Sequence, residues 1–368
     1  MLTRGDDYPI HQTAEPIAYA GTDRNFYDRY FFNGYPADPA DDRIFALAFG
    51  VYPALNIADA HFCWLAGGRQ VNLHASRWLG MERMALEVGP IRLAVEEPLR
   101  RLRVTVSAPE QGVAADLRFT GRSFPIEEPR FTRRIGPRTL LDYTRLTQNG
   151  AYEGWLEVDG ARTDVAGFVG TRDRSWGVRP VGARDPQLPA PDAPPQFHWL
   201  WAPCIFPDRD LFFHSNDDEH GRPWNRRAVW APVGAGPEEE RAFDAARARL
   251  SLRPDTRHAA AAELTLADER GASAVAFEPT ADFFMLGLGY GHPTWGHGVN
   301  RGELAVERED FATAELDRAQ PHHFHVQALS RVIWRDPDRS ERVGRGVLEQ
   351  LAIGPHAPSG FAGLTDLA

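Results

Sequence analysis

The segment from Asp173 to Gly177, with the sequence DRSWG, places an acid, an arginine and an indole within five residues. An aspartate beside a tryptophan can be shielded from water, and shielding raises its pKa toward the range of a general acid. Arg174 favours the opposite outcome, in which it pairs with Asp173, pins a turn and leaves Trp176 in the core. Both interpretations stay open at this point, and Asp173 is the candidate catalytic acid.

Histidines form a second group that is capable of chemistry. The stretch GYGHPTWGHG, residues 289–298, carries His292 and His297, and HHFH follows at 322–325. Zinc sites use defined ligand spacings, and neither HExxH nor CxxC occurs in this chain. We therefore expect loop histidines that hydrogen-bond to backbone groups, and no metal. Tyr290 and His292 are candidate substrate-binding residues at a pocket rim, and a metal-dependent enzyme using His292 and His297 ranks last.

Motifs for nucleophilic or cofactor chemistry are missing. The chain has no GxSxG motif and no GxGxxG motif placed between a strand and a helix. All 41 basic residues are arginine, which excludes a Schiff-base lysine and a phosphate-loop lysine. Cys63 and Cys204 cannot build a disulfide framework, and we interpret them as inert buried thiols. The expectation is an enzyme without a cofactor.

Charge and hydropathy narrow the class of partner. The net charge is −10 and no basic block stands out, so nucleic acid is not expected as a partner. There is no run of eighteen apolar residues, so we expect no membrane span. The polar start MLTRGDDYPIHQTAEP lacks the apolar centre of a signal peptide, which predicts a cytoplasmic protein. The expected partner is a lipophilic small-molecule substrate, and a homodimer is left open.

Strands must position these residues, because alternation of apolar and polar side chains dominates the chain. Residues 102–106 and 113–119 alternate on either side of a turn, which predicts a hairpin. Asp159 and Gly160 form a favoured two-residue hairpin turn. Further strand pairs are expected at 197–216, 263–278 and 323–354.

Helical pattern is scarce. The best candidate runs from Pro237 to Leu250, with proline at its start and acids in its first turn. Many short strands with glycine and proline between them predict an all-β fold, a barrel or a sandwich, with few short helices.

A proline-rich stretch, residues 184–196, divides the chain. Proline-rich segments mark loops and linkers, so we predict one β-barrel-like domain over residues 1–185 and a second over 196–368. GTRDRSWG at 170–177 and GYGHPTWG at 289–296 share the pattern of a glycine, five residues and then Trp-Gly. If this echo is a repeat, both halves place a Trp-Gly corner at an equivalent point.

Aromatic strands carry the remaining candidates. His198 and Trp201 lie on one predicted strand, and His214 and Asn216 on the next. His214 and Asn216 are two residues apart and therefore share a face. A mouth lined by aromatic side chains with a few polar groups is typical of a site for an apolar ligand. We expect His198, His214 and Asn216 to orient water or a substrate oxygen, and Trp176 and Trp201 to line the cavity.

DRSWGVRP, residues 173–180, resembles the Asp-His-x-Trp-Gly signature of the carotenoid 1,2-hydratase (hydroxyneurosporene synthase) and AttH-like superfamily. The resemblance implies two lipocalin-like β-barrel domains in tandem. It also implies addition of water across an isoprenoid double bond, in which a carboxylic acid protonates the alkene and water captures the cation. Arg174 stands where the signature has histidine and cannot shuttle a proton near neutral pH. A different apolar substrate, terpenoid, steroid or aromatic-derived, is therefore expected.

These observations predict a cofactor-independent hydratase, lyase or isomerase that acts on an apolar alkene, with Asp173 as the acid and His198 and His214 as further catalytic candidates. The alternative is a non-catalytic carrier of lipophilic ligands. A buried polar pair in an aromatic cavity would favour the enzyme, and a purely apolar lining would favour the carrier.

Overall fold

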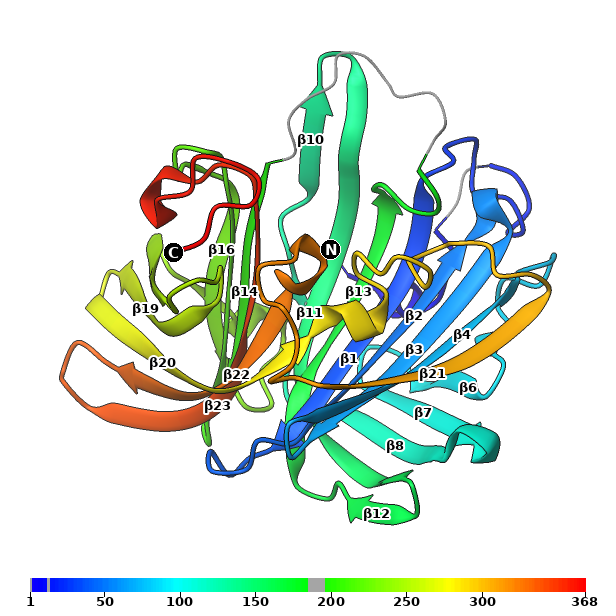
Figure 1. The fold of residues 1–368 in the computed structure, drawn as a ribbon. Helices are drawn as coiled ribbons and strands as arrows, with labels where there is room; N and C mark the ends of the chain where they lie inside the picture. The colour runs from blue at the N-terminus through cyan, green and yellow to red at the C-terminus, as the bar shows by residue number, and fades with distance from the viewer. Residues whose placement is uncertain (1, 12–13, 185–195) are drawn as a thin grey trace.

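Two curled antiparallel sheets make up the protein, as a computed structural model that describes residues 2–11, 14–184 and 196–368 shows (Figure 1). The first sheet has fourteen strands in the order β21-β4-β3-β2-β1-β13-β11-β8-β7-β6-β5, with β9, β10 and β12 paired to β11. Its strands are β1 (Phe26–Pro36), β2 (Ile44–Tyr52), β3 (Ile57–Ala66), β4 (Arg69–Trp78), β5 (Glu87–Val88), β6 (Ile91–Glu97), β7 (Arg101–Ala108), β8 (Val113–Gly121), β9 (Ile126–Glu127), β10 (Phe131–Ile135), β11 (Arg138–Val158), β12 (Ala161–Asp164), β13 (Phe168–Val178) and β21 (Leu304–Ala312).

The second sheet has nine strands in the order β17-β16-β15-β14-β23-β22-β20-β19-β18. Its strands are β14 (Phe197–Ile205), β15 (Arg209–Asp217), β16 (Pro223–Pro232), β17 (Arg241–Ala242), β18 (Ala245–Leu252), β19 (Ala259–Asp268), β20 (Gly271–Phe284), β22 (Val326–Arg335) and β23 (Glu341–Ile353). The predicted all-β fold is confirmed, and the two curled half-barrel sheets agree with tandem lipocalin-like units.

Short 3-10 turns are the only helices in the described part of the chain. They are η1 (Arg4–Asp7), η2 (Pro53–Leu55), η3 (Pro109–Gln111), η4 (Pro237–Glu239), η5 (Met285–Leu288), η6 (Pro321–His323) and η7 (Ala357–Ser359). None of these described helices is long and apolar enough to cross a membrane.

The predicted hairpins are confirmed. β7 and β8 pair with Val106 opposite Ala115, and β11 and β12 pair across the turn at Asp159 and Gly160. Both turn residues have positive φ, 52° and 79°, as a type I′ turn requires. The other three expected pairs correspond to β14 with β15, β19 with β20, and β22 with β23.

The predicted helix from Pro237 to Leu250 is wrong. This stretch forms η4, then the two-residue β17, and then β18, which pairs with β19 over its whole length. Its alanines, arginines and glutamates have high helix propensity, but propensity is a weak preference that tertiary pairing overrides. In β18, Ala246 points toward the core and Arg247 points toward solvent. This alternation has the two-residue period of a strand and not the period of a helix.

The structure does not place the two Trp-Gly segments at equivalent points. GTRDRSWG lies within the extended strand β13, whereas GYGHPTWG follows η5 as a series of turns. The first segment therefore belongs to the first sheet, whereas the second belongs to no strand, and the echo does not mark a structural repeat. Most of the proline-rich stretch, residues 185–195, lies outside the described residues. The division into domains 1–185 and 196–368 stays a prediction.

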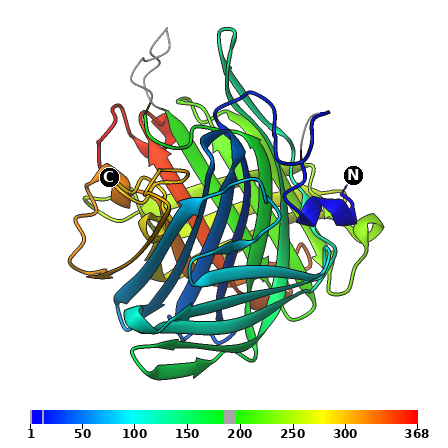
Figure 2. The same cartoon turned by 90° about the vertical axis from the view of Figure 1, so that its right-hand side faces the viewer.

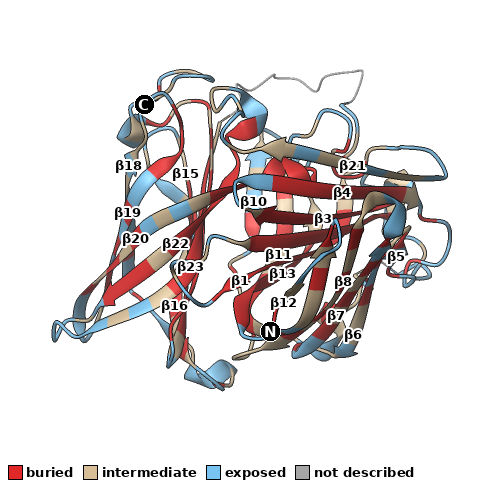
Figure 3. Cartoon of the chain, turned by 60° about the horizontal axis from the view of Figure 1, so that its bottom comes forward, coloured by how far each residue is buried: buried red, intermediate tan, exposed pale blue. Residues whose placement is uncertain are grey.

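Strand alternation sorts the apolar side chains into three cores. One lies inside the curl of the first sheet, a second inside the curl of the second sheet, and a third between the sheets. On β14, Trp199 enters the core between the sheets and Leu200 enters the core of the second sheet. Strands with both faces covered are almost continuously buried, as β3 and β4 show in Figure 3.

One strand crosses between the halves. β21 follows the second sheet's β20 in the chain but pairs with β4 at the edge of the first sheet, with Glu309 opposite Asn72. Figure 2 shows the strands of the first sheet curling into a half-barrel. The crossing strand ties the turn-rich segment after η5 to the first sheet, so that this segment closes one side of the space between the sheets (Figure 1).

Candidate active site

β13 presents the acidic segment of the sequence with alternate side chains on opposite faces. Asp173 and Ser175 face the second sheet, where they line a cavity. Arg174 and Trp176 point to the other face, where Arg174 lies over the Tyr30 ring. A strand, rather than a turn, therefore separates the acid from the arginine that follows it.

Neighbouring strands add a row of cations beside the acid. β13 lies between β1 and β11, and their register aligns Arg29, Ser175 and Arg145 side by side. Ser175 is small, so both guanidinium groups can reach the same cavity. Asp173 lies one step further along the same face.

The next row is aromatic and depends on Gly177. Its register partners are Tyr27 and Tyr143, whose rings meet edge to face with centroids 6.0 Å apart. Gly177 has φ 137°, and a Cβ there would lie 2.6 Å from the Cα of Tyr143 and 2.3 Å from the carbonyl oxygen of Asp142. Only glycine fits between the two tyrosines in this conformation.

These rows form one wall of a cavity of about 190 Å³ between the two sheets. The second sheet and the segment after η5 supply the other wall. The lining residues are Tyr27, Arg29, Leu141, Tyr143, Arg145, Asp173, Ser175, Arg179, Pro180, Phe197, Trp199, Tyr290, His325, Glu349 and Leu351. Drug-sized ligand pockets span about 300–1,000 Å³, so this cavity suits a small substrate or one end of a longer one.

Asp173 lies buried in the cavity wall, and in the described part of the chain its carboxyl group has no close partner. Its side chain is 11% exposed, and its nearest charged partner is Arg145, whose Nη1 lies 3.9 Å from Oδ2. Among the described residues, nothing donates a hydrogen bond to its carboxylate. Burial raises the pKa of Asp173 to about 6, against the opposing effect of Arg145 and Arg29. This carboxyl group can therefore hold and release a proton near neutral pH.

Arg145 has a different role, because a carboxylate behind the cavity wall already balances it. Its Nε donates to Glu128 Oε2 at 3.1 Å, and its guanidinium lies 4.6 Å from the centre of the Trp199 ring. Glu128 also accepts from the Thr147 hydroxyl at 2.5 Å. This pairing keeps Arg145 from binding Asp173 directly.

The opposite wall carries a second acid, Glu349, whose oxygens are fully engaged. Glu349 accepts hydrogen bonds from Trp199 Nε1 at 2.9 Å and from Gln327 Nε2 at 2.7 Å. His325 Nε2 lies 2.8 Å from its Oε1. The His325 contact and these donors hold the pKa of Glu349 below its usual value despite burial. Glu349 is therefore an anchored carboxylate rather than a proton donor.

Arg174 and Trp176 do not reach the cavity. Arg174 forms a fully buried ion pair with Asp28, which also lies 3.3 Å from His11 Nδ1. Trp176 stacks on the His11 ring with centroids 3.9 Å apart. The expected placement of Trp176 in the cavity lining is thus not found, and the interpretation that Arg174 clamps Asp173 is wrong, because strand alternation sends Arg174 and Asp173 to opposite faces.

His214 and Trp201 lie behind the cavity wall rather than in it. Both approach Glu128: His214 Nδ1 lies 3.5 Å from Oε2, and Trp201 Nε1 donates to Oε1 at 3.4 Å. His214 Nε2 is 3.0 Å from Asn225 Oδ1, and burial lowers the pKa of His214 to about 3. These residues support the Glu128–Arg145 pair, and His214 also packs against the lining residue Trp199, with ring centroids 5.8 Å apart.

His198 lies on the other side of the second sheet. Its ring stacks on His356 with centroids 3.7 Å apart and 15° between the planes, and Asp217 completes the group. Stacked parallel rings hold their lone pairs in separate planes, so these lone pairs do not converge on one ion. Asn216 is buried on the His214 side, with its amide 3.5 Å from the His198 carbonyl oxygen. The structure thus does not bring His198 or Asn216 to the cavity of Asp173.

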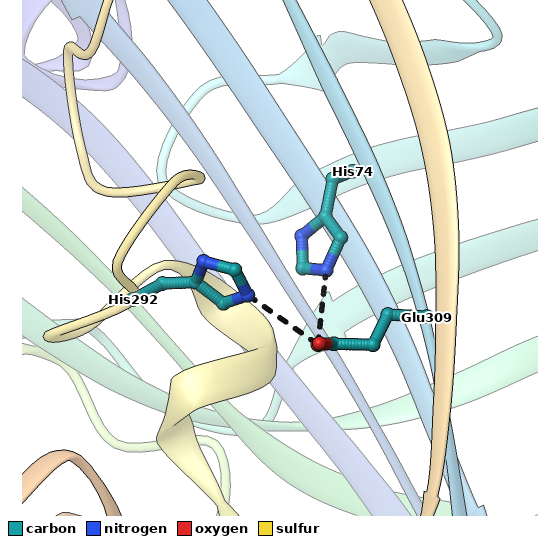
Figure 4. A group of neighbouring side chains, drawn as sticks. All are labelled: His74, His292 and Glu309. Carbon is teal, nitrogen blue, oxygen red and sulfur yellow. Dashed lines mark hydrogen bonds and ion pairs between the residues drawn. The ribbon is translucent and has the colours of Figure 1, made fainter.

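His292 belongs to a separate group with His74 of β4 and Glu309 of β21 (Figure 4). Its Nε2 lies 3.3 Å from Glu309 Oε2, and His74 Nε2 lies 3.8 Å from the same oxygen. His292 Nδ1 accepts the backbone N–H groups of Thr294 and Trp295 at 3.1 and 2.9 Å. The ring proton therefore resides on Nε2 and points at Glu309, where it occupies the lone pair that a metal would use. His292 does not line the cavity of Asp173.

Tyr290 is the one residue of the GYGHPTWGHG segment that lines the cavity. Its ring packs edge to face against His297 and His325, with centroids 4.5 and 4.6 Å away. Arg29 donates to its hydroxyl oxygen. Two of the predicted site residues, Asp173 and Tyr290, are thus brought together in one cavity.

Sequence reasoning missed Arg29, Arg145 and Glu349, and it took His325, which contacts the Glu349 carboxylate, for a loop histidine bonded to backbone. Arg29 offered a signal, because it stands with Asp28 among the aromatic residues of β1, and charges in such a stretch mark a special site. Glu349, in GVLEQLAIG, offers the same signal on β23. Arg145 has no comparable signal, because polar residues surround it in the sequence.

Comparison with known proteins places the chain in a family. Residues 2–362 match the family of unknown function DUF8625, and the protein belongs to this family. No match is found among curated proteins. Among solved structures, a protein from Nitrosomonas europaea that is assigned as AttH has a TM-score of 0.51 and 13% identity, over 89% of this chain and 92% of that one. This likeness supports the expected AttH-like fold.

Two further solved structures are similar at lower scores. Kievitone hydratase from Nectria haematococca has a TM-score of 0.44 and 10% identity, over 88% of each chain. CghA, solved with Sch210972, has a TM-score of 0.49 and 11% identity, over 89% of each chain.

Proposed function

We propose that the protein is an enzyme of the hydratase, lyase or isomerase type that protonates a carbon–carbon double bond of a small molecule, with Asp173 as the general acid. The observation that carries this proposal is the Asp173 carboxyl group. It is buried in a cavity wall, without a hydrogen-bond donor among the described residues, and its pKa is about 6. A carboxyl group of that pKa is matched to proton transfer near neutral pH.

The proposed step keeps protons and electrons balanced. The π electrons of the alkene form a new C–H bond with the Asp173 proton, and the neighbouring carbon becomes electron-poor. In a hydration, water adds to that carbon and its extra proton returns to the Asp173 carboxylate. In an isomerisation, the substrate loses a different proton to the same carboxylate, and the double bond moves. Lyase activity is the hydration in reverse.

The cavity walls suit such a substrate. Tyr27, Tyr143 and Trp199 present rings to the bound molecule, and aromatic faces stabilise positive charge on carbon. Glu128 lies 3.1 Å from Arg145 and balances its charge. Arg145 therefore repels the positive charge that forms on the protonated substrate less strongly. A lining that mixes acids, bases and aromatic rings favours the enzyme over a lipocalin-like carrier, for which an apolar lining is expected.

A labelled-solvent screen tests the proposal. The purified protein is incubated in D₂O with a panel of prenylated phenols, monoterpenoid alcohols and aromatic alkenoic acids, and products are analysed by mass spectrometry. Protonation of an alkene places deuterium on carbon, and hydration also adds the mass of one water. We expect incorporation with wild type and with Asp338→Asn, an exposed control in the turn after β22, and none with Asp173→Asn.

Two results would contradict the proposed function. Equal incorporation by wild type and Asp173→Asn would place the acid elsewhere. Binding of panel members without any deuterium incorporation would favour the carrier.

A further inference from the structure

Two arginines of the cavity have no carboxylate partner. Arg29 donates to the Tyr290 hydroxyl and to the Leu288 carbonyl oxygen at 3.3 Å. Arg179 Nη2 lies 3.1 Å from His297 Nδ1. In the part of the chain that the structure describes, no Asp or Glu oxygen lies within 4.0 Å of either guanidinium group. Both cations are therefore held in place by neutral groups.

The same loop segment fixes both arginines. His297 Nε2 donates to the Leu288 carbonyl oxygen at 2.8 Å, so its Nδ1 keeps the lone pair that accepts from Arg179. The Leu288 carbonyl also receives Arg29. Arg29 and Arg179 thus converge on the segment from Leu288, the last residue of η5, to His297, and both line the cavity.

The acids of the cavity do not balance these two charges. Glu349 is engaged by Trp199, Gln327 and His325, and Asp173 lies nearest to Arg145. Arg29 is only 3% exposed, and its Nε has no hydrogen-bond partner. Asp59 and Asp173 favour the charged form of Arg29 from a distance, but neither carboxylate pairs with it directly. A direct anionic partner of this buried cation would therefore come from outside the chain.

We propose that Arg29 and Arg179 bind a carboxylate group of the substrate, which is therefore a small aromatic or unsaturated carboxylic acid rather than a neutral hydrocarbon. Guanidinium groups recognise carboxylates through two parallel N–H donors, and such charge-assisted hydrogen bonds are among the strongest in proteins. The rings of Tyr27, Tyr143 and Trp199 would then contact the carbon skeleton.

A bound carboxylate has a consequence for catalysis. It neutralises the cation pair that would otherwise oppose positive charge on the substrate. It also adds a negative charge near Asp173, and a nearby like charge favours the protonated form of an acid. The substrate would thus help Asp173 keep the proton that it donates. This inference deepens the proposed function because it concerns the same cavity, but its test measures binding and requires no turnover.

Calorimetric titration of the full-length protein provides that test. The probes are trans-cinnamate, benzoate and 2-naphthoate, each compared with its uncharged amide. We expect wild type to bind at least one carboxylate about tenfold to a hundredfold more tightly than the matched amide. Arg29→Gln and Arg179→Gln should each lose about tenfold in affinity for the carboxylate and keep their affinity for the amide. Arg335→Gln, at an exposed arginine paired with Glu341, is the matched control and should bind as wild type does.

Arg179 is half-buried, so Arg179→Gln keeps the test valid if Arg29→Gln fails to fold. The proposal is overturned if no carboxylate binds, if carboxylate and amide bind equally, or if a folded variant loses affinity for both alike. If the carboxylates bind as expected while Asp173→Asn retains full deuterium incorporation, the proposed acid is wrong and the anion site stands.

Discussion

Substitution of Gly177 tests whether β13 packs as closely against β11 at the cavity wall as the structure shows. In Gly177→Ala, the new Cβ would lie 2.6 Å from the Cα of Tyr143 and 2.3 Å from the Asp142 carbonyl oxygen. Both contacts are to backbone atoms of β11, which cannot move without breaking strand pairing. The residue would also have to keep φ 137°, a region that residues with a side chain rarely adopt.

The expected cost follows from these two effects. The backbone conformation contributes about 1–2 kcal/mol, and overpacking contributes about 1–3 kcal/mol. We therefore expect Gly177→Ala to lower the free energy of unfolding by about 2–5 kcal/mol. Equilibrium unfolding in urea, followed by tryptophan fluorescence, measures this change.

Gly160→Ala is the matched control that measures the cost of the backbone conformation without the overpacking. Gly160 has φ 79°, but nothing lies within 4 Å of the position of its added Cβ. This variant should lose only about 1 kcal/mol. If Gly177→Ala loses no more free energy of unfolding than Gly160→Ala, β13 does not approach β11 as closely as the structure shows.

Three further predictions concern charge and metal. Because burial raises the folded-state pKa of Asp173 from 3.8 to about 6, wild type should lose up to about 3 kcal/mol of stability as the pH rises from about 4 to above 6. Asp173→Asn should then be the more stable protein at pH 8 and match wild type at pH 4, and lower stability of the variant at pH 8 would contradict this. Arg174→Met should lose about 3–5 kcal/mol in urea unfolding, because it leaves Asp28 buried without its closest cation, and an unchanged midpoint would refute that pairing. Chelator treatment should leave the melting temperature unchanged, whereas a loss that zinc restores would identify a metal site at His74, His292 and Glu309.

The fold was largely predictable because strand alternation and turn chemistry act locally. Asp159 and Gly160 specify their own hairpin turn, and the apolar positions 102, 104 and 106 specify one face of β7. Residues 237–250 were not predictable in the same way, because their composition suits a helix and only pairing with β19 selects the strand.

The site was predictable only in part. Asp173 and Tyr290 do line one cavity, but the indole beside Asp173 in the sequence, Trp176, faces away from it and stacks on His11. Arg29 and Arg145 come from strands on either side of β13, and sequence alone does not give the register that aligns them with Ser175. His198 was grouped with His214, but position along neighbouring strands sends them to opposite faces of the second sheet.

We propose that the Asp173 proton drives the reaction. The most direct measurement is the initial rate of product formation by wild type and Asp173→Asn, from pH 5 to pH 8, on an alkene that incorporates deuterium in the screen. We expect the wild-type rate to fall as pH rises through about 6, because only the protonated acid is active. We also expect Asp173→Asn to be folded and slower by roughly a hundred- to ten-thousand-fold. A folded Asp173→Asn variant with the wild-type rate and the wild-type pH profile would refute this role of Asp173.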